Sequence, residues 1–422
     1  MISTLLSIGA CARLCRACDS LRDAALGGEL AQDIDPVQLT RDLIRVRTIN
    51  PPGEEDACAK WLGGVLENYG FSTHLHSFGP KRYNLIAEFG GEKVGPWLGF
   101  SGHLDTVPLG GAPWTRDPFA ADIEGGLLYG RGSTDMKSGV AAFIAACVKS
   151  RSALQRCPGV RLLLTGGEET GCDGAFALKA EEGERLEGLG ALIVGEPTQN
   201  YPYIGHKGAL WIRGCAKGET AHGSMPELGD NAIYKIMDAV GRLRSFKTDH
   251  FHPLMGRCTV SVGTISGGVN VNSVPDRACF EIDVRTVPGV DHAELCSRIA
   301  DQVGPEVALE TFVDVPALIS AETHPWVRRV FSCCAKYHVQ PIVPKVVPYF
   351  TDGSVLVPRS GALPAVILGP GEPQVMHKTD EYCRVDRLLE GMQVYCDVLL
   401  NWVADFETVP TTGDKETFSQ LK

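Results

Sequence analysis

Tyr129-Gly-Arg-Gly-Ser-Thr-Asp135-Met-Lys-Ser-Gly139 is a glycine-rich stretch that stands directly before an apolar segment at residues 140–148. Glycine adopts backbone conformations that other residues avoid, so the chain can turn sharply here and then enter a helix. A side chain at such a turn points into a cleft, and Asp135 is therefore our candidate for the centre of a functional site. The opening Gly130-x-Gly132 also resembles a dinucleotide-binding fingerprint, but that pattern requires glycine where Asp135 stands.

Four further blocks place carboxylate or imidazole side chains directly after a short apolar run. These side chains are His103 and Asp105, Glu168 and Glu169, Glu196, and His377. The runs before them, at residues 96–100, 160–164, 189–194 and 365–371, are continuous, as is typical of strands buried on both faces of a parallel sheet. Open α/β sheets bind their substrates at the carboxyl ends of such strands. This arrangement suits metal ligands, with Asp135 shared by two ions.

The five blocks, in this order, resemble the dinuclear metal aminoacylase and carboxypeptidase superfamily, which includes acetylornithine deacetylase, succinyl-diaminopimelate desuccinylase and bacterial glutamate carboxypeptidase. The resemblance extends from about residue 35 to about residue 400. It implies that one metal ion is held by His103, Asp135 and Glu196, and the other by Asp135, Glu169 and His377. Two imidazoles with three carboxylates suit zinc, and manganese or cobalt is also feasible.

Glu168 and Glu169 are adjacent carboxylates, which cannot both stay ionised at low cost unless a positive charge neutralises them. The metal ions do this for Glu169. Glu168 then has a raised proton affinity and is our candidate general base, which takes a proton from a metal-bridging water to give hydroxide. Asp105 lies two residues after His103, so on a strand both would face the same side. We expect the Asp105 carboxylate to hydrogen-bond the imidazole nitrogen that His103 does not give to a metal.

The pattern of the sequence changes between about residues 204 and 316. Residues 208–216, 258–264, 277–285 and 307–315 alternate like half-exposed strands. Two amphipathic helices lie among them, one behind Asp230 as a possible N-cap and one running through Leu295 and Val303. We therefore predict an α/β fold in which 1–203 and 317–422 form a helix-covered, mostly parallel sheet. Residues 204–316 form an inserted α+β, ferredoxin-like domain, which in the resembled family is a lid and a homodimer interface.

Four residues outside the metal blocks match substrate positions of the resembled family. His222, in the inserted domain, would polarise the scissile carbonyl, and in the family it commonly reaches from the partner subunit. Asn272 and Arg285 would hold the substrate, with the guanidinium of Arg285 offering a fork for a carboxylate. Gly371 would approach the substrate through its backbone.

The sequence departs from the family on the substrate side rather than at the metal ligands. Met376 precedes His377 where alanine is commoner, and Tyr349 and Phe350 stand where small residues are frequent. If Tyr349, Phe350 and Trp114 line the site, they form a flatter and more aromatic pocket. The same aromatic residues are equally compatible with a place in the core.

The leading hypothesis is a two-metal amidohydrolase that removes the acyl group from a small N-acyl amino acid. The alternative is an aryl aminohydrolase, in which ammonia leaves an activated aromatic amine such as a nitroanthranilate. Both reactions use a small-molecule substrate with a carboxylate, which Arg285 fits. A metal-free binding protein descended from such enzymes would have lost ligands, and none is lost.

Composition limits the partners and the location. The net charge of −11 gives no electrostatic footprint for phosphate backbones, so we expect no nucleic-acid partner. No apolar run approaches the roughly 18 residues of a membrane span, and no basic residue precedes the short apolar run at 5–10, so we expect neither a membrane segment nor a signal peptide. The 15 cysteines are odd in number and scattered, and Cys11, Cys15 and Cys18 fit one helix face better than half a zinc site. We predict reduced thiols and a cytoplasmic location.

Overall fold

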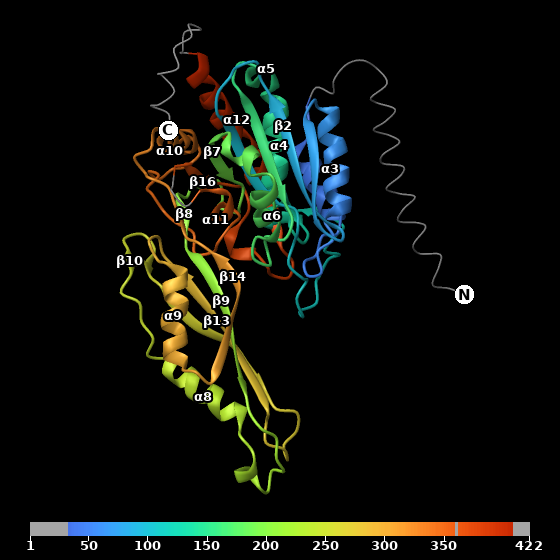
Figure 1. The fold of residues 1–422 in the computed structure, drawn as a ribbon. Coiled ribbons are helices and arrows are strands. Elements are labelled where there is room, and N and C mark those ends of the chain that lie inside the picture. Colours follow the sequence, from blue (N-terminus) through green and yellow to red (C-terminus); the bar gives the residue numbers. More distant parts are fainter. Residues whose placement is uncertain (1–32, 359–361, 408–422) are drawn as a thin grey trace, which may run out of the picture.

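The computed structural model describes residues 33–358 and 362–407 of the chain. The expectations for the N-terminal cysteines and for a signal peptide concern residues outside these ranges. Figure 1 shows one body in which helices surround a sheet, and an elongated second body that extends away from it. Among the described residues, no helix is both long enough and apolar enough to cross a membrane.

The first body contains a six-stranded sheet. In spatial order its strands are β1 (Ser72–Gly79), β2 (Arg82–Gly90), β6 (Gly159–Thr165), β3 (Trp97–His103), β7 (Leu189–Val194) and β16 (Ala365–Ile367). The strands β6, β3, β7 and β16 are parallel, whereas β1 and β2 pair antiparallel at one edge. The predicted α/β class with a mostly parallel sheet is confirmed. The four apolar runs became β3, β6, β7 and β16 because the strands of a sheet covered by helices are buried on both faces.

Helices cover both faces of this sheet. Leu162 and Leu164 of β6 point into one core, and Leu163 between them points into another, as the alternation of a strand requires. The helices of the first core are α2 (Pro36–Arg45), α3 (Asp56–Asn68), α4 (Ser138–Lys149), α10 (Pro325–Ala335) and α12 (Val385–Glu407). The helices of the second core are α6 (Asp173–Glu181) and α11 (Gly353–Leu356). A small sheet of β4 (Ile123–Glu124), β5 (Leu127–Tyr129) and β17 (Tyr382–Arg384) lies apart from the main one.

The helix α4 follows the glycine-rich stretch and is buried along almost its whole length, as expected of a helix that is apolar on every side. At its first turn, a Cβ atom on Gly139 would lie 2.1 Å from the carbonyl oxygen of Gly195. Only glycine allows so close an approach. Gly139 therefore brings the turn that carries Asp135 next to the loop that carries Glu196.

The second body contains a four-stranded antiparallel sheet in the order β12, β13, β9, β14. Its strands are β9 (Gly208–Lys217), β12 (Thr259–Gly267), β13 (Arg277–Thr286) and β14 (Val307–Val315). The helices α8 (Ala232–Leu243) and α9 (His292–Val303) lie side by side against it (Figure 1). Burial along β13 alternates at every residue, which is why the period-two pattern of the sequence predicted it.

The predicted N-cap of α8 is wrong by one residue. The side chain of Asn231, not Asp230, accepts hydrogen bonds from the backbone N–H groups of Ile233 and Tyr234. Asn and Asp are similarly good caps, so composition alone does not choose between adjacent candidates. Asp230 is instead paired with Lys235.

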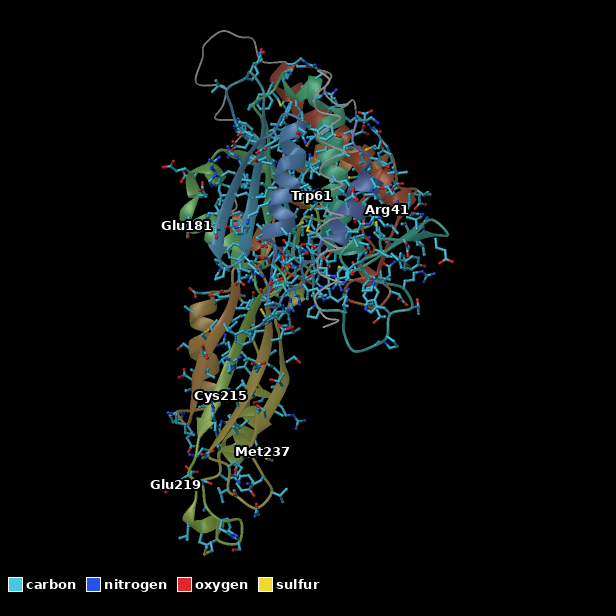
Figure 2. All side chains as sticks on the ribbon, turned by 90° about the vertical axis from the view of Figure 1, so that its right-hand side faces the viewer. Arg41, Trp61, Glu181, Cys215, Glu219 and Met237 are labelled. Carbon is cyan, nitrogen blue, oxygen red and sulfur yellow. A yellow bond between two sulfur atoms is a disulfide. The ribbon has the colours of Figure 1, made fainter. Side chains whose placement is uncertain are left out.

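The prediction that all cysteines are reduced is also wrong. Cys215 of β9 and Cys279 of β13 form a disulfide, with a distance of 4.1 Å between their Cα atoms. They face each other in the strand register, which scattered positions in a sequence do not reveal. Figure 2 shows Cys215 part-way along the second body. The other cysteines of the described residues are free and mostly buried, but this disulfide weakens the argument for a reducing compartment.

Candidate metal centre

The predicted metal ligands that follow strands, together with the predicted general base Glu168, meet at the carboxyl edge of the first sheet. They are His103 at the end of β3, Glu168 and Glu169 after β6, Glu196 after β7, and His377 beyond β16. Their convergence follows from the topology, because parallel strands present their carboxyl ends at the same edge. The centre contains four carboxylates, those of Asp135, Glu168, Glu169 and Glu196, and their side chains are almost fully buried. The His377 side chain is 52% exposed.

Asp135 reaches this edge from the turn between β5 and α4. It lies in η1 (Ser133–Lys137), a short π-helical segment in which its own backbone is extended, with φ −121° and ψ 94°. Gly132 precedes η1 with φ +84°, in the left-handed region that favours glycine. A Cβ atom at Gly132 would also lie 2.6 Å from a methyl carbon of Thr106. The glycines of this stretch therefore allow the backbone conformation that places the Asp135 carboxylate at the carboxyl edge of the sheet.

Asp135 lies between two imidazoles. Its Oδ1 atom is 3.1 Å from Nε2 of His103, and its Oδ2 atom is 3.3 Å from Nε2 of His377. A further carboxylate approaches the same Nε2 atom of each imidazole. Nε2 of His103 is 3.9 Å from Oε1 of Glu196, and Nε2 of His377 is 3.1 Å from Oε2 of Glu169. The centre thus consists of two halves that share Asp135.

Glu168 lies in the half that contains His103. Ligand atoms of His103, Glu168 and Glu196 lie within 4.8 Å of one another, as do those of His103, Asp135 and Glu169. Glu168 is therefore close enough to act on a molecule held between the two halves. Distance alone does not separate a metal ligand from a general base at this position.

Asp105 does not make the hydrogen bond that the sequence predicts for its carboxylate. Nδ1 of His103 is hydrogen-bonded to the backbone carbonyl of Asp105 at 2.9 Å, while the nearest carboxylate oxygen is 3.7 Å away. The reason is that β3 ends at His103, so Asp105 is no longer on the same strand face. A carbonyl can only accept, so Nδ1 carries the proton and Nε2 is left free to bind a cation.

The Asp105 carboxylate has a different task. It accepts hydrogen bonds from the backbone N–H groups of Glu168, at 3.2 Å, and Glu169, at 3.3 Å. It also accepts one from Nδ2 of Asn50 at 2.9 Å. Asp105 therefore holds the turn that carries both glutamates, and Asn50 holds Asp105.

Two buried residues beside the centre were missed by the sequence analysis. Arg131 and Glu381 form an ion pair of 2.6 Å, and each side chain is 1% exposed. Arg131 stands inside the glycine-rich stretch, and Glu381 follows His377 by four residues. In a sequence, a charged residue at either position looks like an ordinary surface residue. The one signal for a buried role was that each lies within a few residues of a predicted metal ligand.

The predicted substrate residues are divided between the two bodies. Gly371 lies against the turn of Asp135, since a Cβ atom there would lie 2.3 Å from the carbonyl oxygen of Thr134. Arg285 lies at the end of β13 nearer the first body, where it pairs with Asp283 at 2.9 Å. Its guanidinium carbon is 5.7 Å from the ring centre of Phe350.

His222 and Asn272 lie together at the opposite end of the second body. The N–H of Gly223 donates to the carbonyl of Asn272 at 2.7 Å, and His222 forms a bridge with Ser273. His222 is exposed, and its Nδ1 atom is 2.8 Å from Oγ of Ser224. Figure 2 labels Glu219, three residues before His222, in the part of the second body that lies far from the first body. Within one chain, these two residues are not brought to the metal centre.

The three aromatic residues considered for the pocket have separate environments. The hydroxyl of Tyr349 donates to the carbonyl of Pro197 at 2.8 Å, which places this ring beside the loop of Glu196. Phe350 packs near Trp211 at 6.0 Å between ring centres. Trp114 lies 5.2 Å from the guanidinium carbon of Arg131. Tyr349 is thus hydrogen-bonded to the loop of Glu196, and Trp114 contacts the glycine-rich stretch of Asp135 through Arg131.

Comparison with known proteins decides the family. A model of peptidase family M20/M25/M40 matches residues 99–401, which include all five blocks of the centre. The chain belongs to peptidase family M20/M25/M40. The resemblance inferred from the sequence is confirmed, and the chain is a metal-dependent hydrolase of amide bonds.

The relatives of this M20/M25/M40 member match it along most of its length. A probable succinyl-diaminopimelate desuccinylase of Staphylococcus epidermidis is 32% identical over 401 residues, covering 86% of this chain and 96% of the relative. A succinyl-diaminopimelate desuccinylase of Roseobacter denitrificans is 30% identical over 394 residues, covering 88% and 99%. Among solved structures, the M20 family metallo-carboxypeptidase Sso-CP2 of Sulfolobus solfataricus has a TM-score of 0.75 at 19% identity, covering 88% of this chain and 100% of that one. The solved structure shows the shared fold.

The residues of this centre fit divalent cations. Four carboxylates surround two imidazoles, so the cluster carries an excess of negative charge in a buried place. Within the described part of the chain, the buried Oε1 atom of Glu169 has no hydrogen-bond partner. A buried carboxylate oxygen without a partner is costly, and a cation would satisfy it. Imidazole nitrogens and carboxylate oxygens are also the ligand types that zinc and manganese accept.

Burial and crowding shift the pKa values of this M20/M25/M40 centre. Burial, followed by repulsion from Glu196, raises the pKa of Glu168 well above its usual value. Burial, followed by repulsion from Asp135, does the same to Glu196. Burial also acts against ionised Asp135, but hydrogen bonds to His103 and His377 outweigh it and lower the pKa of Asp135. Hydrogen bonds to Asp135 and a neighbouring glutamate raise the pKa of His377 to about 10.

The metal-free protein is expected to lose stability as the pH rises from about 5 to about 9. Glu168 and Glu196 bind protons more tightly in the folded than in the unfolded chain, so their stabilising contribution is present at low pH and is lost on deprotonation. His377 acts in the same direction between its ordinary pKa of 6.5 and its folded pKa of about 10. Thermal unfolding midpoints measured across this pH range in a chelator would show the decline.

The control is the same pH series with zinc or manganese in excess. Bound cations replace the protons as counter-charge, so the midpoints should rise at every pH and most of all at high pH. Metal-free midpoints that increase with pH over this range would contradict the assigned electrostatics.

Proposed function

We propose that the chain removes the acyl group from a small N-acyl amino acid by hydrolysing its amide bond at a two-metal centre. The observation that carries this proposal is the place of Asp135, whose two oxygens lie 3.1 Å and 3.3 Å from Nε2 of His103 and of His377. A carboxylate with a separate partner on each oxygen suits a ligand shared by two ions. The relatives named succinyl-diaminopimelate desuccinylase support an N-acyl amino acid as the substrate class.

Each half of the centre would hold one ion. His103, Asp135 and Glu196 form one ligand set, and Asp135, Glu169 and His377 form the other. Zinc suits these nitrogen and oxygen ligands, with manganese and cobalt as alternatives. When bound, the ions polarise the amide carbonyl and lower the pKa of a bound water toward neutral.

Glu168 is the general base of the proposed reaction. Burial raises its pKa well above the usual value, which makes it a stronger proton acceptor than an ordinary carboxylate. It takes the proton of the attacking water as the new C–O bond forms, and it gives this proton to the amine nitrogen as the C–N bond breaks. The products are the free carboxylic acid and the amino acid, with no proton gained or lost by the enzyme.

The remaining residues recognise the substrate in the proposal. Arg285 offers two N–H groups of its guanidinium to the substrate carboxylate, although it must share its charge with Asp283. Gly371 lies against the turn of Asp135 and presents its backbone there. His222 would polarise the scissile carbonyl, and Asn272 would hydrogen-bond the substrate.

A second copy of the chain would supply His222 and Asn272. β13 has ten residues and separates the Arg285 end of the second sheet from the His222 end, a length of about 30 Å at ~3.3 Å per residue. We therefore propose a homodimer formed through residues 204–316, a segment that acts as a lid for the partner. Exposed apolar side chains near this end support an interface there. They are Met225, Leu228, Tyr234 and Met237, the last of which is labelled in Figure 2.

Replacing Glu168 by Gln is expected to lower turnover by about 10²–10⁴-fold while both metal ions stay bound, because the variant removes the proton acceptor but no ligand. Activity and metal content of the same preparation provide the measurement. The matched control is Glu169→Gln, which should lose metal. If Glu168→Gln instead loses metal and its activity follows the occupancy, the two glutamates have exchanged roles.

Mixing inactive His222→Ala protein with inactive Glu168→Ala protein is expected to restore part of the activity. A hybrid dimer contains one centre with an intact Glu168 and an intact His222 from the other subunit. Subunit exchange must be shown independently, for example with differently tagged chains. Exchanged dimers without any recovery would contradict action across the interface.

The substrate class is tested with two panels and two products. The metal-loaded enzyme is expected to release a carboxylic acid from N-succinyl or N-acetyl amino acids and no ammonia from aromatic amines. The aryl aminohydrolase alternative predicts the reverse, with ammonia leaving a nitroanthranilate. Ammonia release without acylase activity would refute the proposed deacylation.

A further inference from the structure

The ion pair of Arg131 and Glu381 connects two segments that carry predicted metal ligands. Arg131 belongs to the turn that leads to Asp135, and Glu381 belongs to the segment that begins at His377. The segments continue into neighbouring strands, since Tyr129 of β5 faces Tyr382 of β17 in the small antiparallel sheet. The backbone N–H of Gly130 also donates to the carbonyl of Glu381 at 2.9 Å.

The Glu381 carboxylate binds the backbone of the Asp135 turn. Its Oε1 atom accepts from the N–H groups of Thr134 at 2.9 Å and of Asp135 at 3.1 Å. Its Oε2 atom accepts from the N–H of Gly132 at 3.1 Å and from Nη1 of Arg131 at 2.6 Å. Both oxygens are thus occupied by donors, and neither is available as a metal ligand.

Arg131 extends the connection to the segment of His377. Its Nη1 atom donates to the carbonyl of Lys378 at 3.3 Å, and its Nη2 atom donates to the carbonyl of His377 at 3.4 Å. Nη2 also donates to the carbonyl of Pro108 at 3.0 Å. One guanidinium therefore holds the backbone of the residue whose imidazole lies 3.3 Å from Asp135.

We propose that Arg131 and Glu381 are positioning residues that set the distance between Asp135 and His377, and thereby the affinity of the cation position between them. This inference rests on the two-metal centre of the proposed function. The pair acts through backbone groups and touches neither the substrate nor the ions. It acts mainly on the half of Glu169 and His377, because the half of His103 and Glu196 is held by β3 and β7.

A merely structural ion pair would behave differently. Buried ion pairs often add little net stability, and their loss is felt through the charge that is left unpaired. Such a role predicts a lower unfolding temperature with unchanged cation affinity in the molecules that remain folded. A positioning role predicts a selective loss of one cation, which thermal stability alone does not produce.

The test is a titration of metal-free protein with zinc, followed by calorimetry and by metal analysis after gel filtration. The variant Glu381→Gln keeps the size of the side chain but replaces one acceptor oxygen by an N–H₂ group that faces other donors. It is expected to bind one of two zinc equivalents about 10–100-fold more weakly, as is typical for residues that orient metal ligands. The reference variant His377→Ala identifies which equivalent belongs to that half, and the same equivalent should be affected.

The matched control is Glu88→Gln. Glu88 forms a similar, largely buried ion pair of 2.6 Å with Arg161, but on β2 and β6 at the opposite end of the first sheet. This variant should keep both zinc affinities. Arg131→Lys is the second variant, since it keeps the positive charge and loses the fork that reaches Lys378 and His377. Arg131→Lys should lower the affinity for the same zinc equivalent, and it provides the test if Glu381→Gln does not fold.

Folded Glu381→Gln or Arg131→Lys protein that binds two zinc ions with the affinities of the unaltered chain would overturn the proposal. A loss confined to the equivalent that His377→Ala retains would also overturn it. The proposed deacylation is judged separately by its substrate panels. It survives if only the titrations fail, and the positioning role survives if the titrations succeed but no N-acyl amino acid is cleaved.

Discussion

Four buried carboxylates, Asp135, Glu168, Glu169 and Glu196, converge at one edge of the first sheet, and their mutual repulsion constrains everything around them. Keeping unpaired charges away from water costs several kcal/mol per ion even after relaxation. The fold can hold these groups together only with protons or cations between them. The repulsion among these carboxylates therefore determines three properties, namely the affinity of this edge for cations, the raised proton affinity of Glu168 and the stability of the edge.

Two further carboxylates solve a second problem, which is to hold irregular turns in place. Asp105 accepts the backbone N–H groups of the turn that carries Glu168 and Glu169, and Glu381 accepts those of the turn that carries Asp135. The turn of Glu168 and Glu169 lies outside helices and strands, and the backbone of Asp135 is extended within η1. The N–H groups of both turns therefore need acceptors from elsewhere. In both cases a carboxylate from a distant part of the sequence supplies them. The ligands are thus positioned through the main chain of the turns.

The sequence predicted those features that depend on local pattern and failed where partners come from far along the chain. The strand at Val307–Val315 was predicted with its observed bounds because its alternation is local. The candidate metal ligands His103, Glu169, Glu196 and His377 were recognised because each follows a buried apolar run, and Asp135 because it lies in a glycine-rich turn. The hydrogen bond of His103 was assigned to the wrong oxygen of Asp105, since the end of β3 is set by the tertiary fold. The Cys215–Cys279 disulfide depends on strand register, and the Arg131–Glu381 pair spans 250 positions of sequence, so neither has a local signal.

The proposed role of His222 requires it to reach the metal centre, which leaves two routes, namely a second copy of the chain or a rotation of the second body. The junction between the two bodies favours the second copy. Val313 and Val315 of β14 and Ala209 of β9 are buried in the second core of the first body, together with residues of β6 and β7. A Cβ atom on Gly171 would meet Val313 at 2.9 Å, so the packing there is close. A rotation large enough to carry His222 over about 30 Å would have to break this packing, whereas a partner subunit can deliver a histidine without disturbing it.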